Sequence, residues 1–230
     1  MSKTRLLDSV QRLDLETTRK LIETTPSLVA VTDRQGRNLL QLACSVSWSK
    51  VRVSQSTQVR LVRYLLDRGF TIDAPVGRDK CTALFFAVAR ARNPTLIKLL
   101  LDRGAQVTSA PGQGLFAAGW WDDTESLGLL IRAGARVDIL SGDTPFLASW
   151  CWKRFEAAKF LARNGANLNA QDAKGRTALH IGIERAFDPA LLKWLVKHGA
   201  SPDIPDRDGI SARLKASRKR DQRFLAALNG

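Results

Sequence analysis

Residues 175–180 read Gly-Arg-Thr-Ala-Leu-His, and residues 195–200 read Leu-Val-Lys-His-Gly-Ala. The first phrase sets a turn and then a threonine, a favoured residue for starting a helix, before an apolar segment. The second phrase ends an apolar segment on a glycine, the residue that most readily takes the left-handed conformation closing a helix. Between them Leu191, Leu192 and Leu195 recur at the spacing of one helix face. The segment therefore predicts two short helices bounded by a turn and a closing glycine.

The closing phrase, in which large aliphatic residues and two polar residues precede a glycine, occurs five times. Successive closing glycines are 35, 30, 31 and 34 residues apart, and they are Gly69, Gly104, Gly134, Gly165 and Gly199. The opening phrase recurs in weaker form at 36–40 (Gly-Arg-Asn-Leu-Leu), 82–85 (Thr-Ala-Leu-Phe) and 142–147 (Gly-Asp-Thr-Pro-Phe-Leu). Two phrases in phase at a period of about 33 residues indicate a repeat protein whose helix pairs stack on their neighbours.

The two phrases resemble the ankyrin repeat, whose signature is a turn followed by Thr-Pro-Leu-His-x-Ala. The resemblance implies an all-α ankyrin-repeat solenoid of stacked antiparallel helix pairs with short β-turn or hairpin connections. We expect one domain over residues 1–230, with an N-terminal cap at 4–31, repeats at about 32–73, 74–108, 109–138, 139–171 and 172–203, and a C-terminal cap at 204–230. The first repeat carries extra residues within 45–57. The third lacks the Thr-Pro pair, so we expect its first helix to be short or bent.

The composition narrows the class of protein. The chain has 230 residues, of which 44% are hydrophobic and 25% charged. It contains no run of about eighteen apolar residues, the length that a membrane-spanning helix needs. Residues 1–14 mix charges into their apolar positions, unlike a secretory signal, so we expect a cytoplasmic protein. The three cysteines, Cys44, Cys81 and Cys151, are too far apart for a disulfide framework or a metal motif.

Catalytic residues are not evident in the sequence. His180 stands at the family's own histidine position, where the resemblance implies structural hydrogen bonds, and His198 precedes a closing glycine. Neither histidine has a partner at triad or metal-ligand spacing. The adjacent Asp122 and Asp123 are expected to cap the following helix. We therefore predict that the chain is not an enzyme and uses neither cofactor nor metal.

The resemblance implies that partners bind to the turn tips and first helices, which line the concave side of an ankyrin array. Counting from each threonine position, tryptophans fall at the groove positions of the middle repeats, as Trp120, Trp121 and Trp152. Clustered exposed indoles are typical of the centre of a binding site. Trp150 and Trp194 are expected in the core instead. The alternative for the first three is packing against the long loop of the first repeat or the irregular third repeat.

Basic residues are unevenly distributed around these tryptophans. The net charge is +14; residues 32–108 have a balance of +8, residues 109–138 of −2, and the last twenty residues of +5. Basic flanks around an apolar centre would suit an acidic partner, although solubility alone would also explain the charge. The predicted partner-binding residues are Trp120, Trp121, Trp152, Arg90, Arg185, Trp48, Arg78 and Lys80, with a second basic cluster at Arg213, Lys215, Arg218, Lys219, Arg220 and Arg223.

Our leading hypothesis is a monomeric adaptor or inhibitor that binds an acidic protein and masks or neutralises it. Small bacterial ankyrin proteins that this chain resembles include immunity partners of toxins, so the resemblance implies that role as one form of masking. Nucleic acid or another polyanion is the alternative, because basic and aromatic residues together can hold single strands. The acids Asp122, Asp123 and Glu125 beside the Trp pair argue against it. A structural spacer would bind neither.

Overall fold

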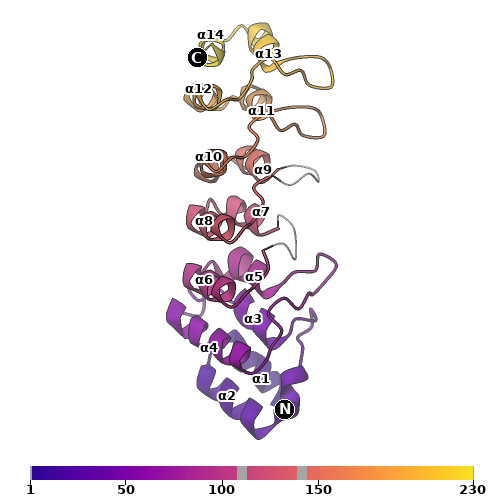
Figure 1. The fold of residues 1–230 in the computed structure, drawn as a ribbon, viewed down its shortest axis with the longest axis vertical. Helices are drawn as coiled ribbons and strands as arrows, with labels where there is room; N and C mark the ends of the chain where they lie inside the picture. Colours follow the sequence, from indigo (N-terminus) through magenta and orange to yellow (C-terminus); the bar gives the residue numbers. More distant parts are fainter. Residues whose placement is uncertain (1, 108–112, 139–143, 230) are drawn as a thin grey trace. The chain divides into compact units, whose positions relative to one another are not determined.

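The computed structural model describes residues 2–107, 113–138 and 144–229, and its elements are helices joined in antiparallel pairs (Figure 1). Within these residues there is no β-strand, and two isolated bridges, Val76–Cys81 and Pro205–Ser211, close turns. The all-α prediction is confirmed. None of the described helices is both long and apolar enough to cross a bilayer. The expected starts of the third and fourth repeats, residues 109–112 and 139–143, lie outside the described residues and include Gly142 and Asp143.

The chain divides into two compact units. The N-terminal unit comprises Met1–Ala118 and Gly128–Ala135, and the C-terminal unit comprises Gly119–Leu127 and Arg136–Gly230. Helices α7 (Gln113–Trp120) and α8 (Thr124–Arg132) contribute residues to both. The N-terminal unit also contains α1 (Ser2–Gln11), α2 (Leu15–Thr24), the 3-10 helix η1 (Pro26–Ala30), α3 (Leu39–Ser45), α4 (Gln55–Asp67), α5 (Ala83–Phe86), the π-helix η2 (Ala87–Ala91) and α6 (Pro94–Asp102).

The C-terminal unit arranges its helices in two rows. One row holds the first helix of each pair, α9 (Pro145–Cys151), α11 (Ala178–Glu184) and α13 (Ala212–Lys219) (Figure 1). The other holds the second helices, α10 (Phe155–Arg163), α12 (Pro189–Lys197) and α14 (Gln222–Leu228). The predicted repeat boundaries and the single domain stay predictions.

Helix starts follow the predicted capping chemistry. The side chain of Thr144 accepts a hydrogen bond from the backbone N–H of Leu147 at 3.1 Å, and Asn38 forms a reciprocal capping box with Gln41. Such caps satisfy backbone donors that a helix end leaves unpaired. All five closing glycines have φ between 85° and 102°, the left-handed conformation that the sequence predicted.

His180 performs the structural role that the resemblance implied. Its Nδ1 accepts a hydrogen bond from the backbone N–H of Thr177 at 3.1 Å, and its Nε2 lies 2.9 Å from the carbonyl oxygen of Ile210. Because a backbone N–H can only donate, Nδ1 is the acceptor. Nε2 therefore carries the ring proton and donates a hydrogen bond to the carbonyl oxygen. The buried imidazole therefore ties α11 to the turn before α13.

The first helix of the second repeat contains an irregularity that sequence reasoning missed. Helix α5 runs directly into the π-helical turn η2, which ends at Arg92 in the left-handed region with φ 50°. Arg92 comes ten residues after the N-cap Thr82, whereas the matching residue comes nine after the cap in two later pairs, Lys153 after Thr144 and Ala186 after Thr177. One extra residue is thus absorbed as a π-turn. The third repeat's first helix, expected to be short or bent, is not short, since α7 has eight residues and α9 and α11 have seven each.

The long connection of the first repeat is held by a buried polar contact. The side-chain amide of Gln58 donates to the carbonyl oxygens of Ala43 and Val46, both at 2.9 Å. Its carbonyl accepts from Asn93 at 3.0 Å, which extends the network to the cap of α6. The extra residues follow α3, within the predicted range 45–57. The hydrogen bonds of Gln58 fix the end of the helix before them.

An aromatic cluster fills the core of the C-terminal unit. Trp150 is fully buried, as expected, and its ring meets those of Phe155 and Phe187 edge-on at 5.2 and 5.8 Å. Edge-to-face contacts at these distances are the favoured arrangement of aromatic pairs. The Trp150 ring therefore packs against the first residue of α10 and the segment that follows α11.

Candidate functional site

Three indoles gather where the first helices end in the C-terminal unit. Trp120 ends α7 and Trp121 follows it, and each exposes 45% of its surface. Trp152 follows α9 and is half-buried, because its ring meets that of Trp120 edge-on at 4.9 Å and 76°. We call Trp120, Trp121 and Trp152 the indole site. The structure thus brings together Trp120 and Trp152, two of the predicted partner-binding residues.

Two aspartates set the backbone of this site. Asp123 accepts hydrogen bonds from the backbone N–H and the hydroxyl of Ser126, at 3.0 and 2.6 Å, so the predicted cap on α8 is confirmed. Asp122 instead accepts from the backbone N–H of Ala157 at 2.7 Å, in the first turn of α10. Carboxylates are stabilised at helix N-termini, where the backbone carries partial positive charge. Both acids are therefore engaged in fixing the turn that displays the tryptophans.

Two arginines lie beside the indole site. The guanidinium of Arg154 lies over the Trp120 ring, 5.9 Å from its centroid, within the range of a cation–π contact. The Nη1 of Arg185 donates a 2.6 Å hydrogen bond to the carbonyl oxygen of Cys151, the residue before Trp152. The structure therefore places the predicted Arg185 next to the tryptophans. Sequence reasoning missed Arg154, because its contact with Trp120 joins residues far apart in the chain.

The other predicted partner-binding residues belong to the N-terminal unit. Arg78 and Lys80 are exposed in the turn after Val76, and Arg90 is exposed on the π-turn η2. Trp48 is half-buried in the turn that follows α3. Among the described residues none of these three cations takes part in an ion pair, so their charge is open to a partner.

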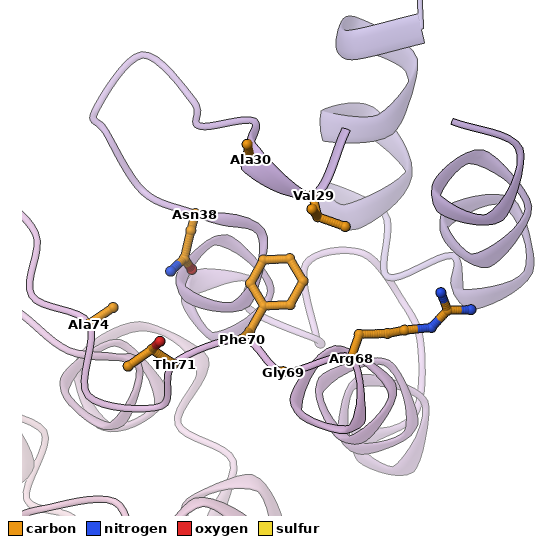
Figure 2. Close-up of a pocket in the computed structure, with 8 residues that line it drawn as sticks. All are labelled: Val29, Ala30, Asn38, Arg68, Gly69, Phe70, Thr71 and Ala74. Atoms are coloured by element: carbon orange, nitrogen blue, oxygen red, sulfur yellow. The ribbon is translucent and has the colours of Figure 1, made fainter. Parts of the chain in front are cut away.

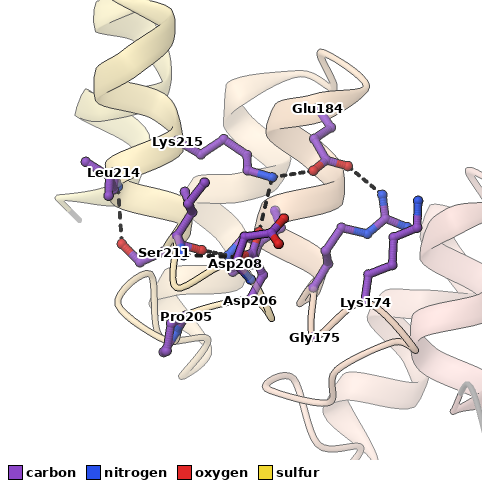
Figure 3. A network of polar contacts seen from close by, with 12 residues as sticks. Lys174, Gly175, Glu184, Pro205, Asp206, Asp208, Ser211, Leu214 and Lys215 are labelled. Atoms are coloured by element: carbon purple, nitrogen blue, oxygen red, sulfur yellow. Dashed lines mark hydrogen bonds and ion pairs between the residues drawn. The ribbon is translucent and has the colours of Figure 1, made fainter.

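The basic cluster of the C-terminal cap differs in this respect. Arg213 pairs with Asp203 at 2.7 Å, Arg223 pairs with Asp221 at 2.9 Å, and Lys219 donates to the carbonyl oxygen of Ile183. Much of the positive charge that the sequence concentrates there is therefore used in local structure. Lys215 lies between two acids, Glu184 at the end of α11 and Asp206 in the turn before α13, as Figure 3 shows.

Glu184 joins this network to the preceding turn. Its carboxylate accepts from Lys215 (Figure 3) and, at 2.6 Å, from Arg176, which also pairs with Asp172. Burial of the carboxylate raises the pKa of Glu184, but the hydrogen bonds and charges of Lys215 and Arg176 lower it by more, so the pKa lies below its ordinary value. Glu184 therefore links Lys215 on α13 to Arg176, which precedes α11.

A pocket of about 290 Å³ opens in the N-terminal unit, and sequence reasoning missed it (Figure 2). Its signal in the sequence is Phe70, which follows a closing glycine where the four later repeats have alanine. Of these alanines, Ala200 is buried, whereas the Phe70 side chain lines the pocket. The lining residues are Val29, Ala30, Asn38, Arg68, Gly69, Phe70, Thr71 and Ala74.

Trp194 corrects an expectation. It was predicted in the core, but it is half-buried on α12, where the imidazole of His198 stacks on its ring at 3.8 Å and 23°. Although Trp194 belongs to the apolar stripe of the helix, its ring is covered by His198 and not by core residues. Within the described residues, no group of three or more His, Cys, Asp or Glu side chains could hold a metal ion.

Comparison with known proteins identifies the repeats. The family model for ankyrin repeats, in three copies, matches residues 115–218. An ankyrin repeat-containing protein of Treponema pallidum is 31% identical over 134 residues, which cover 56% of this chain and 45% of that protein. The chain spans less than half the length of the curated relatives it matches, and only 16% of the phosphocholine transferase AnkX of Legionella pneumophila.

Solved structures agree on the fold. The ankyrin repeat domain of Bcl-3 superposes with a TM-score of 0.79 at 24% identity, covering 98% of both chains. The human ASB11 ankyrin repeat domain gives 0.76 at 20% identity, covering 97% of this chain and 96% of its own. At this level of identity the likeness concerns the fold. Residues 115–218 therefore match ankyrin repeats, and the chain has the fold of an ankyrin-repeat domain.

Proposed function

We propose that this chain binds an acidic protein through the indole site and masks the surface that it covers. Ankyrin repeats indicate a protein–protein interaction module, and ankyrin domains are generally non-catalytic. The observation that carries the site is the exposure of Trp120 and Trp121, 45% each, beside Trp152. Tryptophan and arginine dominate the energy of protein interfaces, and exposed apolar patches mark interaction sites.

An acidic partner is supported by the cations that have no ion pair among the described residues. They are Arg154 and Arg185 beside the indole site and Arg78, Lys80 and Arg90 in the N-terminal unit. Complementary charge accelerates encounter, and the indoles would then supply most of the affinity. The proposal includes a monomeric, non-catalytic, cytoplasmic protein. Neutralisation of a toxin would be one form of the masking.

The experiment begins with affinity capture from the source organism, followed by identification of the captured protein and calorimetric titration of the purified pair. We expect the variant Trp120→Ala/Trp121→Ala to bind about 30-fold more weakly, because interface tryptophans typically contribute about 2 kcal/mol or more. Trp194→Ala is the matched control, since it removes a half-buried indole of the same unit that lies outside the site.

The helical circular dichroism spectrum must be the same for all three proteins. A dissociation constant within twofold of wild type for the double variant would remove the site assignment. Capture of nucleic acid that shows a steep salt dependence, with no protein bound, would favour the polyanion alternative.

A further inference from the structure

Arg154 differs from most arginines of the C-terminal unit in its surroundings. Its guanidinium lies over the ring of Trp120, and its Nε is buried without a hydrogen-bond acceptor among the described residues. It stands at the N-cap of α10 but makes no side-chain capping bond there. The Trp120 ring thus holds the guanidinium, which forms no ion pair with the residues that the structure describes.

The charge balance around Arg154 is equally distinctive. Among the described residues no carboxylate pairs with Arg154 or Arg185, whereas Arg176 and Arg213 are paired at 2.6 and 2.7 Å. Two of the three acids beside the tryptophans are used elsewhere, since Asp122 and Asp123 accept from backbone N–H groups. Ion pairs with the described part of the chain therefore do not neutralise the cations at the indole site.

We propose that Arg154 receives a carboxylate of the partner, while an aromatic or aliphatic side chain next to that carboxylate packs on Trp120 and Trp152. This inference rests on the proposed function and names the chemistry that the site selects. Because Nε is buried, the donors for this carboxylate are the two terminal nitrogens, Nη1 and Nη2, whose planar arrangement matches a carboxylate in bidentate geometry. Arg185, held on the carbonyl oxygen of Cys151, supplies a second positive charge near Trp152.

The test uses two small probes that differ in one charge. N-acetyl-L-phenylalanine carries an aromatic ring beside a carboxylate, and its amide carries the same ring beside a neutral group. In 15N-labelled protein each indole N–H gives one NMR signal, and single Trp→Phe variants assign them. We expect the acid to shift the Trp120 and Trp152 signals and to bind about tenfold more tightly than the amide, as charge-assisted hydrogen bonds typically allow.

Variants of Arg154 then test whether this residue causes the preference for the acid over the amide. Arg154→Met should abolish it, and Arg154→Lys, which keeps the charge but not the planar donors, should retain only part of it. Arg163→Met, which removes an exposed guanidinium over Trp194 outside the indole site, is the matched control and should leave both affinities unchanged. Thermal melts show whether the variants fold. The comparison of the acid and the amide on wild-type protein is valid even if a variant does not fold.

Three results would overturn the inference: equal affinity for acid and amide, no shift of either indole signal by the acid, or an unchanged preference in Arg154→Met. The proposed function is tested separately, by the partner affinity of Trp120→Ala/Trp121→Ala. A partner that needs the tryptophans but tolerates Arg154→Met would therefore retain the indole site and remove only its carboxylate chemistry.

Discussion

The indole Nε1 of Trp150 on α9 donates a 2.9 Å hydrogen bond to the backbone carbonyl oxygen of Ala178 on α11. The same ring contacts Phe155 and Phe187, so one buried side chain joins two neighbouring helix pairs. We expect Trp150→Ala to lower the free energy of unfolding by about 3–5 kcal/mol, as large core deletions do. Trp150→Phe should cost less, because it keeps an aromatic ring in the cluster.

Urea unfolding followed by circular dichroism measures both changes. Trp121→Ala is the control for loss of an indole, and its exposed side chain should cost about 0.5 kcal/mol or less. A Trp150→Ala protein as stable as this control would show that the aromatic cluster does not hold the unit together.

Stability should depend on pH through Glu184. Its pKa in the folded chain is below the ordinary value, so its stabilising effect is complete above about pH 4.3, the unfolded value, and is lost as the pH falls through the folded pKa. The variant Glu184→Gln should therefore be less stable than wild type at pH 7, and the difference should shrink below about pH 4.

Urea midpoints measured between pH 7 and pH 3 test this dependence, with the exposed Glu125→Gln as control. A difference between Glu184→Gln and wild type that stayed constant over this range would exclude the network of Arg176 and Lys215 as its source.

Two glycines separate backbone strain from packing between turns. Gly175 and Gly199 both have positive φ, 76° and 102°. A Cβ on Gly199 would meet nothing within 4 Å, whereas one on Gly175 would lie 2.7 Å from the backbone nitrogen of Arg207. Gly199→Ala should cost about 1 kcal/mol from the left-handed conformation alone. Gly175→Ala should cost about 1–3 kcal/mol more, because the next turn must move.

Chemical denaturation of the two variants gives the comparison directly. Equal losses would mean that the turn containing Arg207 yields freely, and that its 3.1 Å hydrogen bond to the carbonyl oxygen of Lys174 contributes little.

The exposed cations of the N-terminal unit should act on the rate of association. Replacing Arg78, Lys80 and Arg90 with alanine should slow binding to the identified partner by about tenfold at low salt and weaken its salt dependence. The dissociation rate should change little. Surface plasmon resonance at several salt concentrations separates the two rates, and an association rate insensitive to the triple change would refute a steering role.

Local chemistry explains how far the fold could be predicted. The N-cap of Thr144 and the closing glycine Gly165 depend on residues within a few positions of one another, and both were predicted. For His180 the resemblance implied a structural role, and its bond from Thr177 is equally local. The insertion in the second repeat was missed, since one extra residue before Arg92 could equally have lengthened the loop.

The candidate site was less accessible to sequence reasoning, because its contacts join distant residues. Trp120 and Trp152 were placed by counting along repeats, but the guanidinium of Arg154 over Trp120 and the pairing of Lys215 with Glu184 depend on which turns meet. Periodicity also misassigned Trp194, whose ring is covered by His198 one helical turn away.

The π-turn of the second repeat has a practical consequence for anyone who recombines these modules. After Ala87, a residue of the second repeat lies one position farther from its N-cap, Thr82, than the equivalent residue lies from Thr144 or Thr177 in the later repeats. A chimaera spliced by simple counting would rotate the end of the helix by one residue, exchanging the exposed Arg90 with the buried Ala91. Exchanging the second repeat with a later one therefore requires deleting one residue of the π-turn, because the two repeats are equivalent only up to that point.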